Sequence, residues 1–396
     1  MLILFAFNCY ADGSTIDVGS PVIWKDESVN IPDEGMIISS ELRLEGEVKL
    51  YGGSVSIVGR GRIIAGMNSN VTIDNVTFLS SGIEPGENEM PVNLISILGG
   101  AKSSFRVKDS EFIAEIEYSP DSSLNPWDQP PRYWIIAMPD TPKRYSSQTK
   151  LNIERSKFTS TNPYSVGAIS IRPTARGKYA PIFSGEISGN SFSGFHGVIV
   201  AGNLSGFSIT GNRLVKNTFA NIFAGGDRVK IEDNVILYPG GGTTGDGITA
   251  IGKFTNSKIQ KNTIFAGSCY GILLKGDQIN NVDISSNSIT SGITTAIQVE
   301  SQKKSAKNIL VSRNIISSNK GFAVTFIGVD DSSVDDNDFS DNAPGFPSQV
   351  YVERTSGINV TKNMVASPIG PDWAEKLELN RSHVSTDNST FTLLPQ

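Results

Sequence analysis

The sequence predicts an all-β fold, a parallel β-helix solenoid of about 11 to 12 turns in a single domain. Three observations favour this fold class. A six-residue motif recurs at nearly constant spacing, most copies follow a second run of apolar residues, and the 39 glycines suit many tight turns. A length of 396 residues is compatible with one long solenoid.

The recurring motif has Ile or Val at its first position, asparagine at its fourth and an apolar residue at its sixth. Its asparagines are separated by 22, 22, 28, 25, 27, 23 and 26 residues. The copies are ISGNSF (187–192), ITGNRL (209–214), IEDNVI (231–236), IQKNTI (259–264), ISSNSI (284–289), VSRNII (311–316), VDDNDF (334–339) and VTKNMV (360–365). Degenerate copies precede them, namely IDNVTF (73–78), VKDSEF (107–112) and IERSKF (153–158), with IVGRGRI (57–63) as a further candidate. We expect each asparagine to take left-handed backbone at a bend, and stacked asparagines to form a side-chain ladder.

The second apolar runs predict a further strand in each turn. They include GAISIR, HGVIVA, ANIFAG, DGITAI, YGILLK, TAIQVE and FAVTFI. Two or three short strands in about 25 residues are typical of a parallel β-helix, whose turns stack at the strand spacing of roughly 4.8 Å. We therefore assign residues 12–50 to an N-terminal cap, 51–365 to the β-helix, and 366–396 to a C-terminal cap or tail in which DWAEKLEL forms a short helix.

Charge and hydropathy exclude two classes of partner. Because 34 Lys and Arg face 40 Asp and Glu, the chain lacks the basic character of a nucleic-acid-binding protein. No later apolar run reaches the roughly 18 residues that a membrane helix needs. Residues 1–11 are typical of the end of a secretory signal peptide, with a buried N-terminal strand as the alternative. We expect a secreted or periplasmic monomer.

The repeat is similar to that of the pectin-lyase-like right-handed parallel β-helix superfamily, over roughly residues 50–365. That superfamily contains polysaccharide lyases, glycoside hydrolases, uronate C5-epimerases and phage tailspikes. The resemblance implies a right-handed coil, a carbohydrate ligand and a bacterial exopolysaccharide or biofilm-matrix context. The catalytic motifs of the superfamily are not matched, since only RPTAR (172–176) approximates the pectate-lyase Arg-x-Pro-x-x-Arg. No cofactor or metal site is assigned, and Ca²⁺ is the one candidate.

Insertions into the repeat are expected at 79–104, 113–132 and 139–150, and such insertions often carry the binding surface. The second is rich in proline and precedes Trp134, whose indole suits a sugar ring or packs the loop onto the coil. Two basic stretches, DTPKRYSS and IRPTARGKYAP, favour an anionic ligand over ordinary solvated surface. The residues concerned are Lys143, Arg144, Arg172, Arg176, Lys178 and Tyr179.

Aligning the second runs by their apolar residues predicts one inward column. That column contains Ile169, Val198, Ile222, Ile248, Ile272 and Ile297. Strand alternation then places Arg172, Lys275 and Glu300 on one outward face. At the entry to the neighbouring strands lie His196, Asp246 and Tyr270, so the six residues occur within about five stacked turns.

These residues predict β-elimination from an acidic polysaccharide. A lyase must neutralise the uronate carboxylate, remove the C5 proton and protonate the leaving oxygen. Arg172 and Lys275 are the candidates for neutralisation, His196 for the base and Tyr270 for the acid, while Asp246 orients His196 or helps to hold a cation. The alternatives are an epimerase, a hydrolase that uses Asp246 with Asp227 or Glu300, and a glycan-binding protein without activity. His196 and Asp246 also have ordinary structural roles in turns as an alternative.

Overall fold

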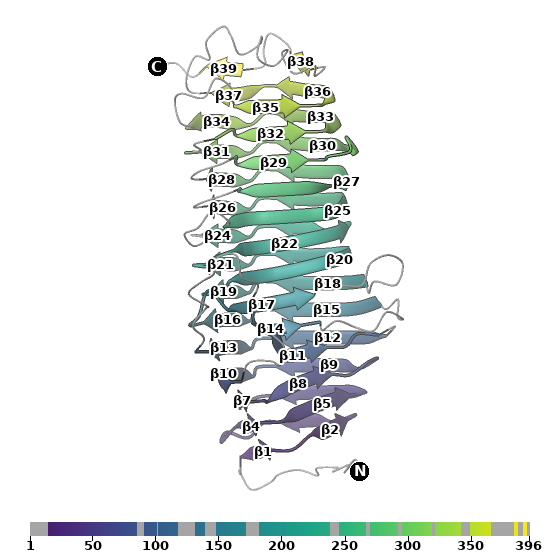
Figure 1. Ribbon diagram of the computed structural model, residues 1–396, viewed down its shortest axis with the longest axis vertical. Coiled ribbons are helices and arrows are strands. Elements are labelled where there is room, and N and C mark those ends of the chain that lie inside the picture. Colours follow the sequence, from purple (N-terminus) through teal and green to yellow (C-terminus); the bar gives the residue numbers. More distant parts are fainter. Residues whose placement is uncertain are drawn as a thin grey trace. The chain divides into compact units, whose positions relative to one another are not determined.

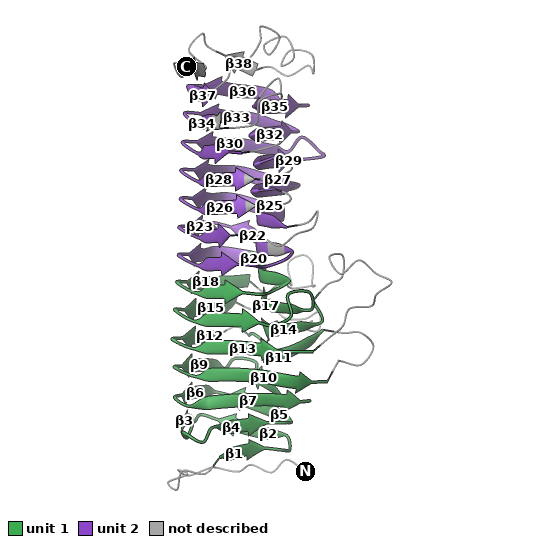
Figure 2. Cartoon of the chain, turned by 90° about the vertical axis from the view of Figure 1, so that its left-hand side faces the viewer, with its two compact units in different colours: residues 1–203 green, residues 204–396 purple. Residues whose placement is uncertain are grey.

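The computed structural model describes residues 15–84, 91–100, 102–117, 131–138, 148–171, 182–237, 245–266, 270–291, 295–318, 321–341, 349–365, 384–386 and 391–393. The regular structure in these ranges is β-strand (Figure 1). The chain divides into two compact units, residues 1–203 and 204–396 (Figure 2). In both units three strand segments make one turn, and equivalent strands of successive turns pair in parallel. The predicted parallel β-helix is confirmed.

Unit 1 contains three columns of strands. The first column is β1 (Ile16–Val18), β4 (Met36–Ile38), β7 (Ser54–Gly59), β10 (Thr77–Ile83), β13 (Glu111–Glu115), β16 (Lys157–Ser160) and β19 (Ser191–Ser193). The second is β2 (Val22–Lys25), β5 (Glu41–Glu45), β8 (Arg62–Ala65), β11 (Val92–Ile97), β14 (Tyr133–Ala137), β17 (Val166–Ile171) and the start of β20 (Gly197–Thr210). The third is β3 (Ser28–Asn30), β6 (Glu47–Tyr51), β9 (Asn70–Asp74), β12 (Ser103–Lys108), β15 (Gln148–Glu154) and β18 (Ile182–Ser188).

Unit 2 repeats the same arrangement. Its first column is β21 (Arg213–Val215), β24 (Val235–Leu237), β26 (Thr263–Ala266), β28 (Ser288–Ser291), β31 (Ile315–Ser317), β34 (Asp338–Asp341), β37 (Asn363–Val365) and β39 (Phe391–Leu393). The second is β22 (Ala220–Asp227), β29 (Ile297–Glu300), β32 (Val324–Ile327) and β35 (Val350–Glu353), together with the first halves of β25 (Asp246–Gln260) and β27 (Ile272–Ser285). The third is β23 (Lys230–Glu232), the second halves of β25 and β27, β30 (Ala306–Ser312), β33 (Val329–Asp335), β36 (Ser356–Thr361) and β38 (Val384–Thr386).

The coil extends past both boundaries that the sequence predicts. Residues 12–50 were expected to form a cap, but β1 pairs in parallel with β4 and β3 with β6, so the described part of this range already forms coil turns. Beyond residue 366, β38 and β39 pair in parallel with β36 and β37. In the described ranges the first columns hold seven strands in unit 1 and eight in unit 2, more than the 11 to 12 turns expected. The outermost turns lack the asparagine motif, which explains why the motif count falls short.

Parts of the expected insertions are regular strand. β11 lies within 79–104, and β15 begins within 139–150. Residues 118–130 and 139–147, the DWAEKLEL segment and the N-terminal residues 1–14 lie outside the described residues.

Seven buried asparagines of unit 2 form the expected ladder. In each described step the backbone N–H of one asparagine donates to the side-chain Oδ1 of the asparagine one turn further along, at 2.9 or 3.0 Å. The members are Asn212, Asn234, Asn262, Asn287, Asn314, Asn337 and Asn363, and none is more than 1% exposed. The ladder satisfies the backbone donors at a buried corner where the strand pairing is interrupted.

Unit 1 has an equivalent column of hydrogen bonds, in which serines take part. Val76 N donates to Ser110 Oγ, Ser110 N to Ser156 Oγ, and Ser156 N to Asn190 Oδ1, at 3.2, 3.2 and 2.8 Å. The degenerate motif copies therefore occupy the same structural position as the complete ones. Two residues further on, a column of phenylalanines stacks with ring centroids 4.6 to 4.8 Å apart.

The left-handed residue at each corner is the one before the asparagine, which corrects the prediction. Asp233 and Lys261 have φ of 56° and 55°, whereas the described asparagines of the ladder have no positive φ. The asparagine is retained because its buried amide satisfies two neighbouring turns, while its exposed predecessor supplies the bend.

Candidate functional site

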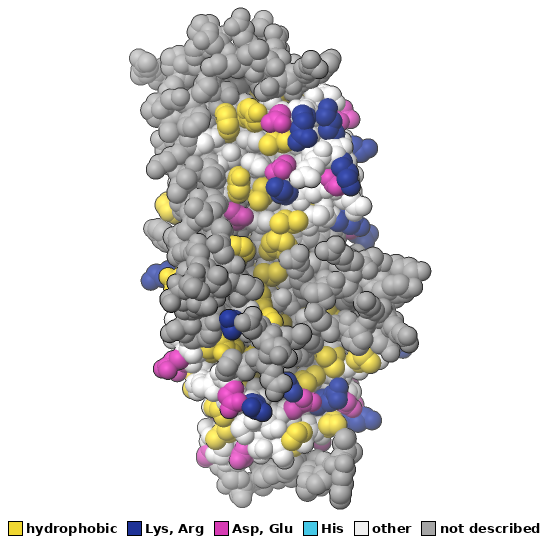
Figure 3. Space-filling model, viewed as in Figure 1, with side chains coloured by type: hydrophobic (Ala, Val, Ile, Leu, Met, Phe, Trp, Pro, Cys, Tyr) yellow, Lys and Arg dark blue, Asp and Glu magenta, His cyan; other side chains and the backbone are white. Residues whose placement is uncertain are grey.

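The second column in unit 2 carries two of the predicted site residues on its outward face, Lys275 and Glu300, and two at the entry to its strands, Asp246 and Tyr270. Ile248 pairs with Ile272 and Ile272 with Ile297, which confirms that part of the predicted inward column. These isoleucines are fully buried. The residues that alternate with the inward ones point outward on β22, β25, β27, β29, β32 and β35. We call this surface the unit 2 face. Hydrophobic side chains gather over this region beside acidic and basic ones (Figure 3).

Asp246 begins β25, at the entry to the strands of the unit 2 face. Its Oδ2 accepts a hydrogen bond from Thr249 Oγ1 at 2.9 Å, and its Oδ1 accepts one from the backbone N–H of Tyr270 at 3.3 Å. Burial raises the pKa of Asp246, and the two hydrogen bonds oppose that rise only in part. The raised pKa makes this carboxylate a stronger base than an ordinary surface aspartate.

Two buried asparagines that the sequence did not single out support the backbone of Asp246. Asn221 Nδ2 donates to the Asp246 carbonyl at 3.2 Å, and Asn217 Nδ2 donates to Asn221 Oδ1 at the same distance. Both asparagines are fully buried. The available signal was NTFAN (217–221), which places polar residues just before an apolar run. This network fixes the entry to β25 and hence the position of the carboxyl.

Lys275 and Glu300 form an ion pair on adjacent strands of the same face. Lys275 Nζ lies 3.2 Å from Glu300 Oε2, and Gln298 Nε2 donates to the same oxygen at 3.2 Å. The Lys275 side chain is 47% exposed and that of Glu300 only 19%, so the ammonium is the group presented to a ligand. The pair lies further along its strands than Asp246 and Tyr270.

The predicted hydrolase pairs do not have the geometry that hydrolysis needs. Glu300 is two strands and five strand positions away from Asp246, or about 19 Å between Cα atoms at standard strand dimensions. Carboxylates that hydrolyse glycosides lie about 5 to 9.5 Å apart. Asp227 is in register with Thr255, nine residues past Asp246, and is engaged by Asn256 and Thr255. Those hydrogen bonds lower the pKa of Asp227, Asn256 being the larger cause.

His196 lies in unit 1 and is buried, with 2% of its surface exposed. Its backbone N–H donates to the Val166 carbonyl at 2.8 Å. The predicted inward column is wrong by one residue here, because Ile169 pairs with Ile199 rather than with Val198. Two successive buried residues, Val198 and Ile199, make the periodicity ambiguous at this strand.

Trp134 is a packing residue in the described structure. A methyl group at Gly167 would lie 2.3 Å from carbons of its indole ring, and one at Gly197 would lie 3.3 Å away. The two glycines thus leave a gap that the ring fills across two neighbouring turns. Trp134 is 9% exposed, which favours the packing interpretation over a sugar platform.

The other predicted binding residues lie outside the described residues. They are Lys143, Arg144, Arg172, Arg176, Lys178 and Tyr179. The neighbouring residue Ile171 pairs with Ala201, the partner that the sequence assigned to Arg172. Their roles stay predictions.

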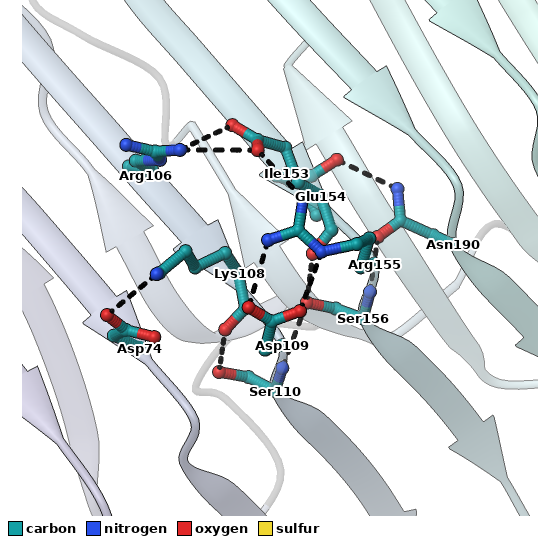
Figure 4. Close-up of polar contacts among 10 residues, drawn as sticks. All are labelled: Asp74, Arg106, Lys108, Asp109, Ser110, Ile153, Glu154, Arg155, Ser156 and Asn190. Carbon is teal, nitrogen blue, oxygen red and sulfur yellow. Dashed lines mark hydrogen bonds and ion pairs between the residues drawn. The ribbon is translucent and has the colours of Figure 1, made fainter.

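Unit 1 carries a second polar cluster, on β9, β12 and β15 (Figure 4). Arg155 binds Asp109 through two bonds of 2.8 and 2.9 Å, and Arg106 Nη2 lies 3.2 Å from Glu154 Oε1. Arg155 and Asp109 occupy left-handed corner positions of adjacent turns. The charges of this cluster pair with one another, which indicates a structural role.

Among the described residues, no group of three or more His, Cys, Asp or Glu side chains could hold a metal ion. No helix in these ranges is long and apolar enough to cross a membrane.

Comparison with known proteins identifies the fold. Residues 144–307 match the family described as "Right handed beta helix region". The protein is a right-handed parallel β-helix. No curated protein matches the chain.

Solved structures with a similar fold include enzymes and phage proteins. A mannuronan C-5 epimerase A-module from Azotobacter vinelandii is 12% identical, with 97% of this chain and 90% of that chain covered and a TM-score of 0.41. A mannuronic acid specific polysaccharide family 6 lyase from human gut microbiota is 11% identical, with coverage of 96% and 82% and a TM-score of 0.37. Tailspike protein 3 of bacteriophage CBA120 is 10% identical, with coverage of 96% and 56% and a TM-score of 0.38. Similarity at this level carries no information about the substrate or reaction of this β-helix.

Proposed function

We propose that this β-helix is an exported polysaccharide lyase that cleaves an acidic, uronate-containing exopolysaccharide by β-elimination on the unit 2 face. The observation that supports the proposal is the partly buried carboxyl of Asp246. Its pKa is raised by burial, and it lies one strand away from Tyr270. Raised carboxyl pKa values are typical of sites that transfer protons.

In the proposed reaction Asp246 takes the role that the sequence gave to His196, because the histidine is buried and belongs to unit 1. The Asp246 carboxylate accepts the C5 proton of the uronate. As the C4–O4 bond breaks and the C4=C5 double bond forms, the Tyr270 phenol donates its proton to the departing O4. Exchange with solvent then removes the proton from Asp246 and restores that of Tyr270.

Lys275 supplies a positive charge for the ligand in the proposal. Lys275 is five strand positions from Tyr270, roughly 16 Å along the strand, so its ammonium binds the carboxylate of another sugar in the same chain. Arg172, which the sequence predicts to neutralise the reacting carboxylate, belongs to unit 1 and lies outside the described residues, so it has no part in the proposed steps. No metal takes part in the proposed steps.

The test is to incubate the protein with acidic bacterial polysaccharides and follow the ultraviolet absorbance of unsaturated uronate. Asp246→Asn should abolish turnover. The control Asp233→Asn makes the same chemical change at an exposed corner of unit 2, where asparagine tolerates the left-handed backbone, and should leave turnover unchanged.

Other outcomes identify the alternatives. Exchange of the C5 hydrogen with water without new absorbance would point to an epimerase, and binding without either change would point to a glycan-binding protein. Activity that survives Asp246→Asn but is lost in His196→Gln would restore the imidazole as the base and refute the assignment.

A further inference from the structure

An aromatic pair lies further along the unit 2 face, next to an acidic and a basic side chain. The rings of Phe322 and Tyr351 stack with centroids 5.0 Å apart and an interplanar angle of 27°. Tyr351 Oη donates to Glu353 Oε2 at 3.0 Å, and Arg354 Nε lies 3.3 Å from Glu353 Oε1. These four residues combine an apolar ring surface with hydrogen-bond acceptors and donors.

The group is accessible from solvent. Both rings are partly exposed, and the Glu353 and Arg354 side chains are 39% and 43% exposed. Thr325, in register with Tyr351 on the adjacent strand, is only 3% exposed, so the strand surface beside the Tyr351 ring is covered by packed side chains. Burial and the neighbouring Glu353 raise the pKa of Tyr351, so its Oη keeps its proton and donates to the carboxylate.

We propose that Phe322, Tyr351 and Glu353 form a second carbohydrate subsite, which takes a pyranose ring of the same polysaccharide that reacts at Asp246. The aromatic surface packs against the C–H groups of the sugar, as it does in many ligand sites where apolar contact is combined with a few polar groups. The Glu353 carboxylate accepts hydrogen bonds from ring hydroxyls, and the Arg354 guanidinium donates to ring oxygens. The subsite thus offers apolar surface for the C–H groups of a sugar ring, an acceptor for its hydroxyls and a donor for its oxygens.

The position of this subsite defines the length of the ligand. Register connects Thr249, Leu273, Gln298, Thr325 and Tyr351 across successive strands. Four strand steps correspond to about 19 Å, the length of several linked sugars. We therefore expect the protein to bind and cleave within long chains rather than at the end of short ones. This inference rests on the proposed function only because it assumes that one polysaccharide chain occupies both the site at Asp246 and the subsite at Tyr351.

The experiment measures binding calorimetrically in the Asp246→Asn background, which prevents cleavage. The probes are a disaccharide and a hexasaccharide of a 1,4-linked polyuronate. Tyr351→Leu keeps an apolar side chain against Phe322 but removes the ring, and should weaken hexasaccharide binding about three- to tenfold without changing disaccharide binding. Glu353→Gln removes the carboxylate that accepts hydrogen bonds from ring hydroxyls, and it should likewise weaken hexasaccharide binding without changing disaccharide binding. Phe265→Leu is the control, because Phe265 is a 39% exposed aromatic on another column of unit 2.

The outcomes separate the two proposals. If Tyr351→Leu and Glu353→Gln bind the hexasaccharide as tightly as the control does, the subsite is refuted, whatever the turnover of the wild type. If the wild type cleaves nothing but hexasaccharide binding still depends on Tyr351, the subsite stands and the proposed function fails. Circular dichroism of each variant checks that it is folded.

Discussion

Replacing one rung of the asparagine ladder should destabilise unit 2 far more than replacing a surface asparagine. Asn287 is 1% exposed and takes part in four side-chain hydrogen bonds. Its Oδ1 accepts from Asn262 N and Nδ2, while its Nδ2 donates to the Ile259 carbonyl and to Asn314 Oδ1, all at 2.9 or 3.0 Å. Asn287→Ala leaves a buried backbone donor and a buried carbonyl without these partners.

The magnitude follows from the number of bonds. A buried hydrogen bond contributes about 0.5 to 1.5 kcal/mol net, and an unsatisfied buried group costs about 1 to 3 kcal/mol. The expected loss is therefore about 3 to 5 kcal/mol in the free energy of unfolding. Asn287→Ser should lose less, because Ser110 and Ser156 already fill this position in unit 1, where each hydroxyl accepts a backbone N–H and donates to a carbonyl.

Urea unfolding followed by far-ultraviolet circular dichroism measures these losses. Hydrogen exchange at the Asn262 amide assigns them to the ladder. The control is Asn281→Gly, which removes an exposed amide at a left-handed corner and should cost about 1 kcal/mol or less. A loss for Asn287→Ala equal to that of the control would show that the buried amide bonds do not stabilise the coil.

Three further predictions concern packing and charge. Gly167→Ala should lower the free energy of unfolding by about 1 to 3 kcal/mol, because the added methyl group would lie 2.3 Å from the indole ring of Trp134. Gly197→Ala should lower it less, because its methyl group would lie 3.3 Å from that ring. Denaturation followed by tryptophan fluorescence measures both losses. The Asp109 carboxyl has a pKa lowered by its hydrogen bonds to Arg155, so its contribution to stability is present above its unfolded pKa of about 3.9 and is lost as the pH falls through its folded value. Arg155→Asn, which tolerates the corner backbone, should weaken that acid dependence of the melting temperature. Burial raises the pKa of Asp246, so the wild type loses stability as the pH rises through the pKa that this carboxyl has in the folded protein. The melting temperature of Asp246→Asn should therefore increase relative to that of the wild type as the pH rises.

The sequence predicts the fold well because the coil repeats one simple pattern. The asparagine motif and the apolar alternation are local signals, and stacking repeats them at the same structural position, as the confirmed register of Ile248, Ile272 and Ile297 shows. The first turns were missed because strands such as Glu41–Glu45 alternate in the same way but carry no asparagine motif. There the corners use other residues with positive φ, such as Asp26 and Gly46.

The candidate site was predicted only where alternation was unambiguous. In unit 2 the register pairs Lys275 with Glu300 on one outward face, as the alternation of the sequence predicts, while Asp246 lies at the entry to β25, two residues before the buried Ile248. At HGVIVA four apolar residues are consecutive, and a shift of one residue exchanges the inward and outward faces. With Ile199 on the inward side, the alignment no longer supports His196 as a base that faces solvent. Because His196 is also buried, Asp246 is the better candidate for the base. The raised pKa of Asp246 has no counterpart in the sequence, since it arises from burial against neighbouring turns. Proton-transfer groups in a solenoid are thus best sought where the strand register places a carboxyl at the edge of the buried region.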